Sequence, residues 1–160
     1  MAASCRFAFA VHVLAVLALR RATGGACSDR LAKSVNTNPV VIRRLLSQLR
    51  KAGLVTTHKG ATGGAALSCA PEAIALDAVY RAVETAPSFG PHRNQPNQRC
   101  PVGAGIERVL DEVFSSAQAA LESELARRTL EDVLRAMAIA EAGTAPARPK
   151  VAASRGRKAA

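Results

Sequence analysis

The side chains best suited to chemistry in this 160-residue sequence lie in the segment NTNPVVIRRLLSQLRKAGLV, residues 36–55. Its four cations stand among apolar residues with no acidic residue between them: Arg43, Arg44, Arg50 and Lys51. Such groups bind phosphate, and guanidinium groups also reach guanine edges in the major groove of DNA. A solvated amphipathic helix has the same composition, so the neighbouring elements must decide between the two interpretations.

Local signals predict that this segment is a helix. Asn38 suits the N-cap, Pro39 suits the first helical position, and Gly53 suits the position just past the end. At 100° per residue, one face of the helix is apolar and would enter a core, through Ile42, Leu45, Leu46 and Leu49. The opposite face presents Val40, Arg44, Ser47 and Lys51, with Arg43 and Arg50 on its flank.

The elements around this helix favour DNA binding. A shorter helix, DRLAKSV, is predicted just before it, with Ser28 as its cap and Asp29 in its first turn. The break NTN then joins two helices as in a helix-turn-helix motif. The following stretch LVTTHKGATGGAALSC predicts two strands around a glycine-rich turn, which would form a wing. A nucleotide-phosphate loop at GATGG is disfavoured, because the Walker spacing and a following helix are missing.

The expected DNA contacts come from these two elements. Arg44 and Ser47 are the candidates for reading base edges, whereas the other cations would hold phosphates. Asn38 is expected to serve mainly as the helix cap. The complete set of predicted DNA-binding residues is Thr37, Asn38, Val40, Arg43, Arg44, Ser47, Lys51, His58, Lys59 and Thr62.

The charge distribution agrees with this interpretation. The net charge is +10, made up of +9 in residues 1–70, −4 in residues 71–142 and +5 in residues 143–160. A basic first half followed by an acidic helical part indicates a polyanion-binding head on a separate module. The three histidines lie in unrelated contexts with no HExxH or nucleophile motif, so we do not expect an enzyme.

The N-terminal run FAFAVHVLAVLAL, residues 7–19, predicts a buried first helix rather than a signal peptide. It is too short to span a bilayer, and more arginines follow it than precede it. His12 is expected to be partly buried in this helix. We therefore predict no membrane association, and a cytoplasmic, nucleoid-associated protein with reduced thiols.

The remainder of the chain divides into four parts. A further helix is predicted from about residue 70 to Glu84, which closes a DNA-binding domain at 1–84. A loop, 85–103, precedes a helix of about 24 residues with an apolar stripe, too long for so small a domain to cover. Together with a last helix at 129–140 it would form a dimerisation region, 104–142, and the basic tail 143–160 is expected to be disordered. The fold class is mainly α, with a small hairpin wing and a long dimerisation helix.

Several segments, in this order, resemble the Rrf-two (Rrf2) family of bacterial winged-helix transcriptional regulators. They are RFAFAVHVLAVLA, VNTNPVVIRRLLSQLRKAGLV, GATGGAALS, AIALDAVYRAVE, FGPHRNQPNQRCPVG and ALESELARRTLEDVL. The family includes the IscR, NsrR and CymR types, and this sequence is most similar to the YwnA-like branch. The resemblance covers about residues 4–137. It implies a homodimer that binds a palindromic operator in double-stranded DNA and acts as a repressor.

The cysteines separate this chain from the iron–sulfur members of that family. Those members place three cysteines before the long helix, whereas residues 86–104 hold Cys100 alone. Since a cluster usually takes several thiolates, we expect no cofactor. The alternative function is a thiol- or small-molecule-responsive sensor built on Cys100, His92 and their loop. Quiet packing of Cys100 against the long helix is the simpler interpretation.

Overall fold

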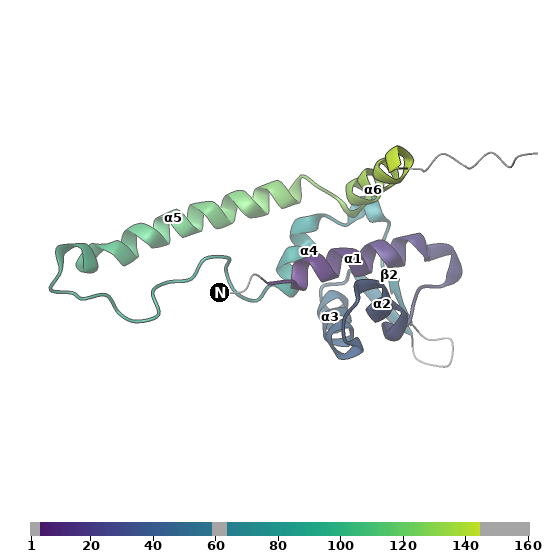
Figure 1. Cartoon of the computed structure of the whole chain (residues 1–160), viewed down its shortest axis with the longest axis horizontal. Helices are drawn as coiled ribbons and strands as arrows, with labels where there is room; N and C mark the ends of the chain where they lie inside the picture. Colours follow the sequence, from purple (N-terminus) through teal and green to yellow (C-terminus); the bar gives the residue numbers. More distant parts are fainter. Residues whose placement is uncertain (1–3, 59–63, 145–160) are drawn as a thin grey trace, which may run out of the picture.

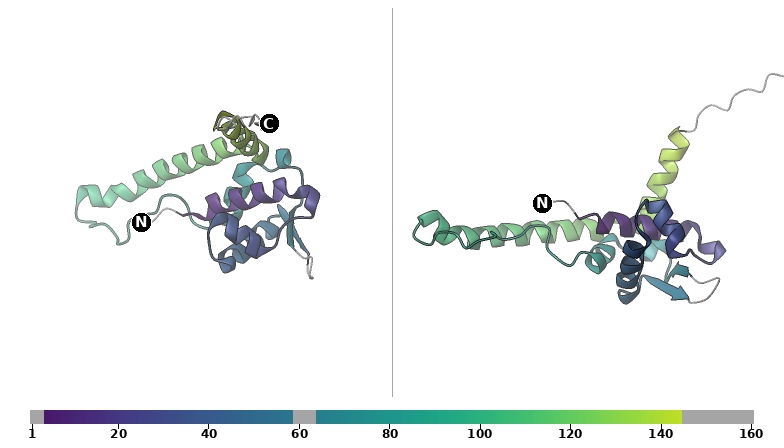
Figure 2. Two further views of the ribbon diagram at one scale, coloured as in Figure 1. Left: turned by 45° about the vertical axis from the view of Figure 1, so that its right-hand side comes forward. Right: turned by 60° about the horizontal axis from the view of Figure 1, so that its bottom comes forward.

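The computed structural model of the chain describes residues 4–58 and 64–144. A head built from the N-terminal elements is joined to a long helix that projects away from it (Figures 1 and 2). The elements in chain order are α1 (Arg6–Leu19), η1 (Arg21–Thr23), α2 (Ser28–Val35), α3 (Pro39–Lys51), β1 (Val55–His58), β2 (Gly64–Leu67), η2 (Pro71–Ala73), α4 (Leu76–Val83), α5 (Pro101–Ala126) and α6 (Leu130–Thr144). None of the helices in the described ranges combines the length and apolar composition that a membrane crossing needs.

Helix α1 lies at the centre of the head. Its buried side chains confirm the predicted first helix and enter the same core cluster as the apolar face of α3: Ala10, Val13, Leu14, Ala15 and Leu17. His12 is not partly buried as predicted. It is exposed, and its Nε2 lies 3.0 Å from the Ser34 hydroxyl of α2. Because α1 is apolar on most of its surface, its one solvent-facing edge holds the polar side chain.

The helix-turn-helix consists of α2 and α3. Asn36 ends α2 in the left-handed conformation, with φ +56°, a region that Asn tolerates better than most residues. Ser28 is not the cap of α2 as predicted but its first residue. The N-cap position belongs to Cys27, which makes no side-chain capping hydrogen bond. Asp29 does lie in the first turn, as predicted.

The predicted wing is an antiparallel hairpin in which Val55 pairs with Leu67 and His58 with Gly64. Ala26 adds a bridge to Ala65, with hydrogen bonds of 3.0 and 2.9 Å between the two residues. The approach is so close that a Cβ on Gly25 would lie 2.1 Å from the Ala65 carbonyl oxygen. Gly25 therefore allows the hairpin to dock on the head.

The helix predicted from about residue 70 to Glu84 is interrupted. It forms the short helix η2 and then α4, with extended backbone at Ile74 and Ala75 between them. Ala75 bridges to Thr129, because the Leu76 N–H donates to the Arg128 carbonyl (2.9 Å) and the Leu130 N–H donates to the Ile74 carbonyl (2.9 Å). A pairing with a segment so distant in sequence outweighs local helix propensity.

The same bridge fixes the start of α6. Thr129 and Asp132 form a capping box: the Thr129 N–H donates to Asp132 Oδ2 (2.9 Å) and the Asp132 N–H donates to Thr129 Oγ1 (3.3 Å). The Thr129 N–H and then the Thr129 hydroxyl, which donates to the same Oδ2 (3.0 Å), lower the pKa of the Asp132 carboxyl. Leu130 is fully buried in the core of the head. The first turns of α6 are therefore packed on the head.

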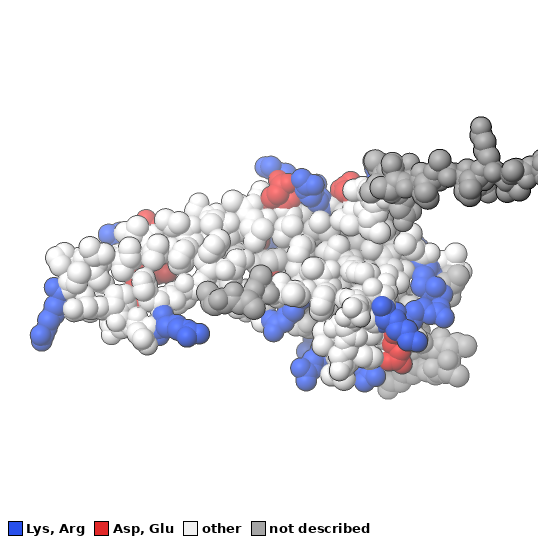
Figure 3. Space-filling model, in the orientation of Figure 1, with Lys and Arg blue, Asp and Glu red and all other residues white. Residues whose placement is uncertain are grey.

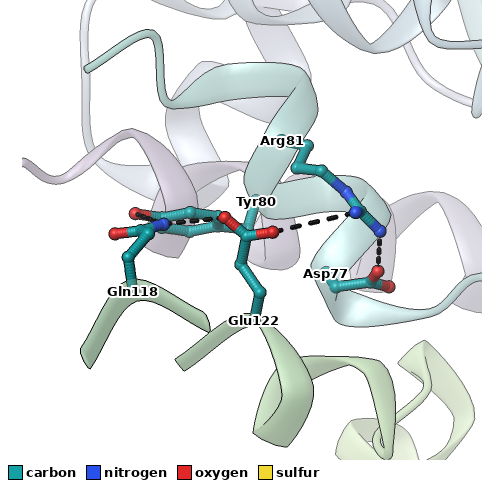
Figure 4. Close-up of polar contacts among 5 residues, drawn as sticks. All are labelled: Asp77, Tyr80, Arg81, Gln118 and Glu122. Atoms are coloured by element: carbon teal, nitrogen blue, oxygen red, sulfur yellow. Dashed lines mark hydrogen bonds and ion pairs between the residues drawn. The ribbon is translucent and has the colours of Figure 1, made fainter. Parts of the chain in front are cut away.

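Helix α5 contacts the head through α4. Arg81 pairs with Asp77 of its own helix and with Glu122 of α5, where Nη1 lies 3.7 Å from Oε2 (Figure 4). The side-chain amide of Gln118 on α5 donates to the Tyr80 hydroxyl (3.3 Å) and to Glu122 (2.9 Å). Asp77 is only 8% exposed, so a charged partner is needed beside it. The network ties one end of the long helix to the head.

Candidate nucleic-acid interface

Helix α3 is capped at both ends by its own sequence. Asn38 Oδ1 accepts a hydrogen bond from the Val40 N–H (2.8 Å), and Pro39 takes the first helical position. At the other end Gly53, with φ +74°, donates to the Arg50 carbonyl (3.0 Å) and Leu54 donates to the Leu49 carbonyl (3.0 Å). This pair of bonds is a Schellman motif. The predicted cap, start and stop are all confirmed.

The two faces of α3 divide as the sequence predicts. Its buried residues are the four expected ones, Ile42, Leu45, Leu46 and Leu49. On the outer surface Arg43, Arg44 and Lys51 are exposed, while Val40 is 46% exposed and Ser47 is half-buried. Thr37, half-buried, and Asn38, exposed, stand just before the helix. One side of the head thus presents cations, a hydroxyl and a methyl-bearing side chain together.

Arg43 is held by the preceding helix. Its Nη2 lies 3.8 Å from Asp29 Oδ1, and its Nε donates to the Ser28 hydroxyl (3.4 Å). The segment 36–55 contains no acid, so sequence reasoning did not identify this partner on α2. Within the described residues, Arg44 and Lys51 make no ion pair. Arg43 is therefore oriented by contacts in the head, whereas Arg44 and Lys51 can turn toward a ligand.

The wing residues lie at the end of the hairpin. His58 is the last residue of β1 and is exposed. Lys59 and Thr62 lie outside the described residues. On the face shown in Figure 3, several patches of basic side chains lie over and around α2 and α3, with one acidic patch between them. The predicted contacts from α3 thus lie in a basic region of the head.

Arg6, a basic residue that the sequence analysis did not single out, stands at the start of α1. It is exposed, and together with Arg44 it lines a hollow between α1 and α3. The two positions are far apart in the sequence, and only the packing of α1 across α3 brings them together. No periodicity within either helix signals this proximity.

The candidate sensor residues lie at the opposite end of the long helix. Cys100 occupies the N-cap of α5 and is exposed, as is His92 in the preceding loop. The pKa of the Cys100 thiol is lowered by the backbone N–H groups of Gly103 and Val102. The cause is therefore the start of the helix.

The four cysteines do not converge. Cys5 precedes α1, Cys27 precedes α2, and Cys69 follows the hairpin half-buried, so these three belong to the head. Among the described residues no three His, Cys, Asp or Glu side chains form a group that could hold a metal ion. The remaining ranges, 1–3, 59–63 and 145–160, contain none of these residue types.

Comparison with known proteins identifies a family and several similar structures. The model of the Rrf2 family, described as "Iron-dependent Transcriptional regulator", matches residues 3–136. A candidate HTH-type transcriptional regulator, YwnA of Bacillus subtilis (strain 168), is 45% identical over 130 residues, covering 81% of this chain and 94% of that protein. A crystal structure of a candidate DNA-binding protein is 42% identical, with a TM-score of 0.64, and covers 81% of this chain and 98% of its own. IscR of T. potens shares the fold, with a TM-score of 0.65, 23% identity, and coverage of 92% and 93%.

Proposed function

Because the chain belongs to the Rrf2 family of transcriptional regulators, we propose that it acts as a homodimeric repressor on a palindromic operator. DNA binding and transcriptional regulation, rather than catalysis, are what its relatives share. The proposal of a homodimer on a palindrome rests on one combination of features, a basic helix-turn-helix and a long helix with an exposed apolar side. Such a regulator works at the chromosome, in the cytoplasm of a bacterial cell.

The exposed apolar side of this helix supports the homodimer. No residue of α5 is buried in the single chain. At 100° per residue, three exposed apolar side chains share one side of this helix: Val102, Val109 and Val113. The predicted stripe is in fact divided, because Phe114 stacks on Phe89 of the loop, with ring centroids 5.4 Å apart. The loop therefore covers one side of the helix and leaves the valine side for a second copy.

Two heads on a two-fold axis would contact two half-sites about one helical turn apart. The domain assignments follow: a DNA-binding head at 1–84, a loop at 85–103 and dimer helices at 104–142, of which α6 also packs on the head. The basic tail 143–160, which lies outside the described residues beyond 144, would add sequence-independent attraction. Occupancy of a promoter by the dimer would be sufficient to block transcription.

Salt dependence tests the proposal. If each dimer neutralises at least six phosphates, operator affinity should fall by about a thousandfold between 50 and 200 mM salt. Fluorescence anisotropy with labelled operator, identified by genomic pulldown, measures this slope, while sedimentation gives the oligomeric state. A monomer in sedimentation, or an affinity that does not change with salt, would exclude the proposal.

The iron in the family description does not fit the residues of this chain. A cluster usually takes several thiolates at about the distance of a zinc–sulfur bond. The long-helix region offers Cys100 alone, and a two-fold axis adds only its copy. We therefore expect colourless protein after anaerobic purification and full operator binding in the presence of chelator. Stoichiometric iron that is lost in Cys100→Ala, measured by metal analysis and visible absorption, would contradict this.

A thiol sensor centred on Cys100 is a second candidate function, favoured by its exposure and its lowered pKa. Because the folded chain lowers that pKa, the thiolate persists at lower pH in the protein than in an unfolded chain. At a pH just below the ordinary thiol range, Cys100 should therefore react with iodoacetamide faster in the protein than in a peptide of residues 96–104. Mass spectrometry after a timed quench gives both rates. Equal rates would remove the basis of the sensor.

A further inference from the structure

The hollow between α1 and α3 has the size of a small-molecule site. Its volume is about 540 Å³, within the range of small-molecule pockets. Phe9 of α1 and Leu45 and Val41 of α3 provide its apolar lining. Val41 is 40% exposed, so an apolar side chain remains accessible to a ligand beside the recognition surface. The polar lining consists of Arg6, Arg44, Ser47, Gln48 and Thr85.

The charged residues that line this hollow are both arginines, and the nearby Glu84 carboxylate is held at the start of α1 by the Ser4 hydroxyl (2.7 Å) and the Phe7 N–H (3.2 Å). Arg6 and Arg44 both line it, and no carboxylate does. Among the described residues neither guanidinium takes part in an ion pair, in contrast to Arg43 with Asp29. An anion in the hollow would be attracted by both guanidinium groups. A guanidinium also matches the planar geometry of a carboxylate.

We propose that this pocket binds a small organic anion with an apolar body, such as an aryl or alkyl carboxylate. The carboxylate would pair with Arg6 and Arg44, and the apolar body would lie on Phe9, Val41 and Leu45. A phosphate of DNA matches the two charges but has no apolar group that could contact the apolar lining. The complementarity of charge and lining together therefore selects a small amphipathic anion.

Occupancy of the pocket has a regulatory consequence, which rests on the proposed operator binding. Arg44 belongs both to the pocket and to the DNA-facing surface of α3, so ligand and operator compete for one side chain. Binding of the anion should therefore weaken operator binding. By linkage, the operator should weaken anion binding by the same factor.

Direct binding is tested first, without DNA. Phenylacetate and hexanoate are titrated into the full-length protein, each against its uncharged amide at matched ionic strength, with NMR of the arginine Nε–H and glutamine side-chain resonances. We expect the carboxylates to shift Arg6, Arg44 and Gln48, and the amides to shift them little. Arg6→Gln should weaken carboxylate binding by about tenfold or more, through loss of a charge-assisted hydrogen bond. Arg93→Gln, which removes the same charge outside the pocket, should leave it unchanged.

Val41→Thr gives a second measure, because it keeps the shape of the lining but places a hydroxyl there. It should weaken the carboxylates severalfold while the fold, followed by circular dichroism, is kept. Failure of both carboxylates to shift the pocket resonances would overturn the proposal. Equal shifts with acid and amide would also overturn it, since charge would then have no part.

A second experiment, which measures operator affinity, tests whether binding of the anion regulates the protein. Saturating phenylacetate should lower operator affinity by about tenfold in the wild type and not in Arg6→Gln. If Arg6→Gln by itself lowers operator affinity as much as Arg44→Ala, the hollow holds a DNA phosphate and the ligand proposal is wrong. Because the NMR titration needs no DNA, a protein that failed to bind any operator would contradict the proposed function and leave the pocket result standing.

Discussion

Val113→Glu should convert the proposed dimer into a monomer. Val113 is 53% exposed on the bare side of α5 and contributes nothing to the core of its own chain, so the head should fold normally. In a two-fold interface the substitution places two carboxylates in apolar surroundings, and each costs several kcal/mol unless it is paired. We therefore expect the dimer dissociation constant, measured by analytical ultracentrifugation, to rise by at least about a hundredfold.

Operator binding should fall with it. Two linked heads bind a palindrome with an avidity that exceeds one head by about 10²–10⁴, because the second contact is intramolecular. Val113→Glu should remove that factor, whereas affinity for a single half-site should stay the same. Ala104→Glu is the matched control, since position 104 is exposed on the opposite side of α5. A variant that remains dimeric and binds the full operator normally would show that the valine side is not the interface.

The elements that could be predicted from the sequence are those with local determinants. The ends of α3 follow from Asn38, Pro39 and Gly53, whose hydrogen bonds span only a few residues. Its buried face follows from the helical period alone. The capping box of Thr129 and Asp132 is equally local. The basic surface of the helix-turn-helix could therefore be located from the sequence.

The errors arise where distant segments meet. Nothing near Ile74 and Ala75 signals the pairing with residues 128–130 that interrupts the expected helix. The same holds for Asp29 on Arg43 and for Arg6 beside Arg44, since each contact depends on how two helices cross. These are also the contacts that set the electrostatics of the candidate site. The site residues could be named from sequence, but their partners could not.

The apolar stripe of α5 shows the same limit in another form. The periodicity includes Val113 and Phe114 in one stripe, although they lie 100° apart around the helix. In the structure Phe89 of the loop stacks on Phe114, while Val113 remains exposed. The sequence alone therefore predicts an apolar helix but cannot separate the side covered by the chain itself from the side left for a partner.

Arg44→Ala should change which operators are bound, not only how tightly. The caps of α3 fix its backbone, and Arg44 has no ion-pair partner among the described residues, so its guanidinium is available to a base edge. Loss of a guanidinium–guanine contact costs about 1–3 kcal/mol and relaxes preference at the contacted position. The affinity of the variant for operators substituted at each base pair in turn, by competition anisotropy, locates that position.

Arg43→Ala provides the contrast on the adjacent residue. Asp29 and Ser28 hold the Arg43 side chain toward α2, an orientation that suits a backbone phosphate better than a base edge. Its loss should weaken all operators by similar factors and reduce the magnitude of the salt slope by about one unit. The two variants remove the same charge from neighbouring positions, so a difference between them reports geometry and not net charge. If both variants weaken every operator equally, Arg44 does not read sequence, and the base-reading face of α3 must lie elsewhere on the helix.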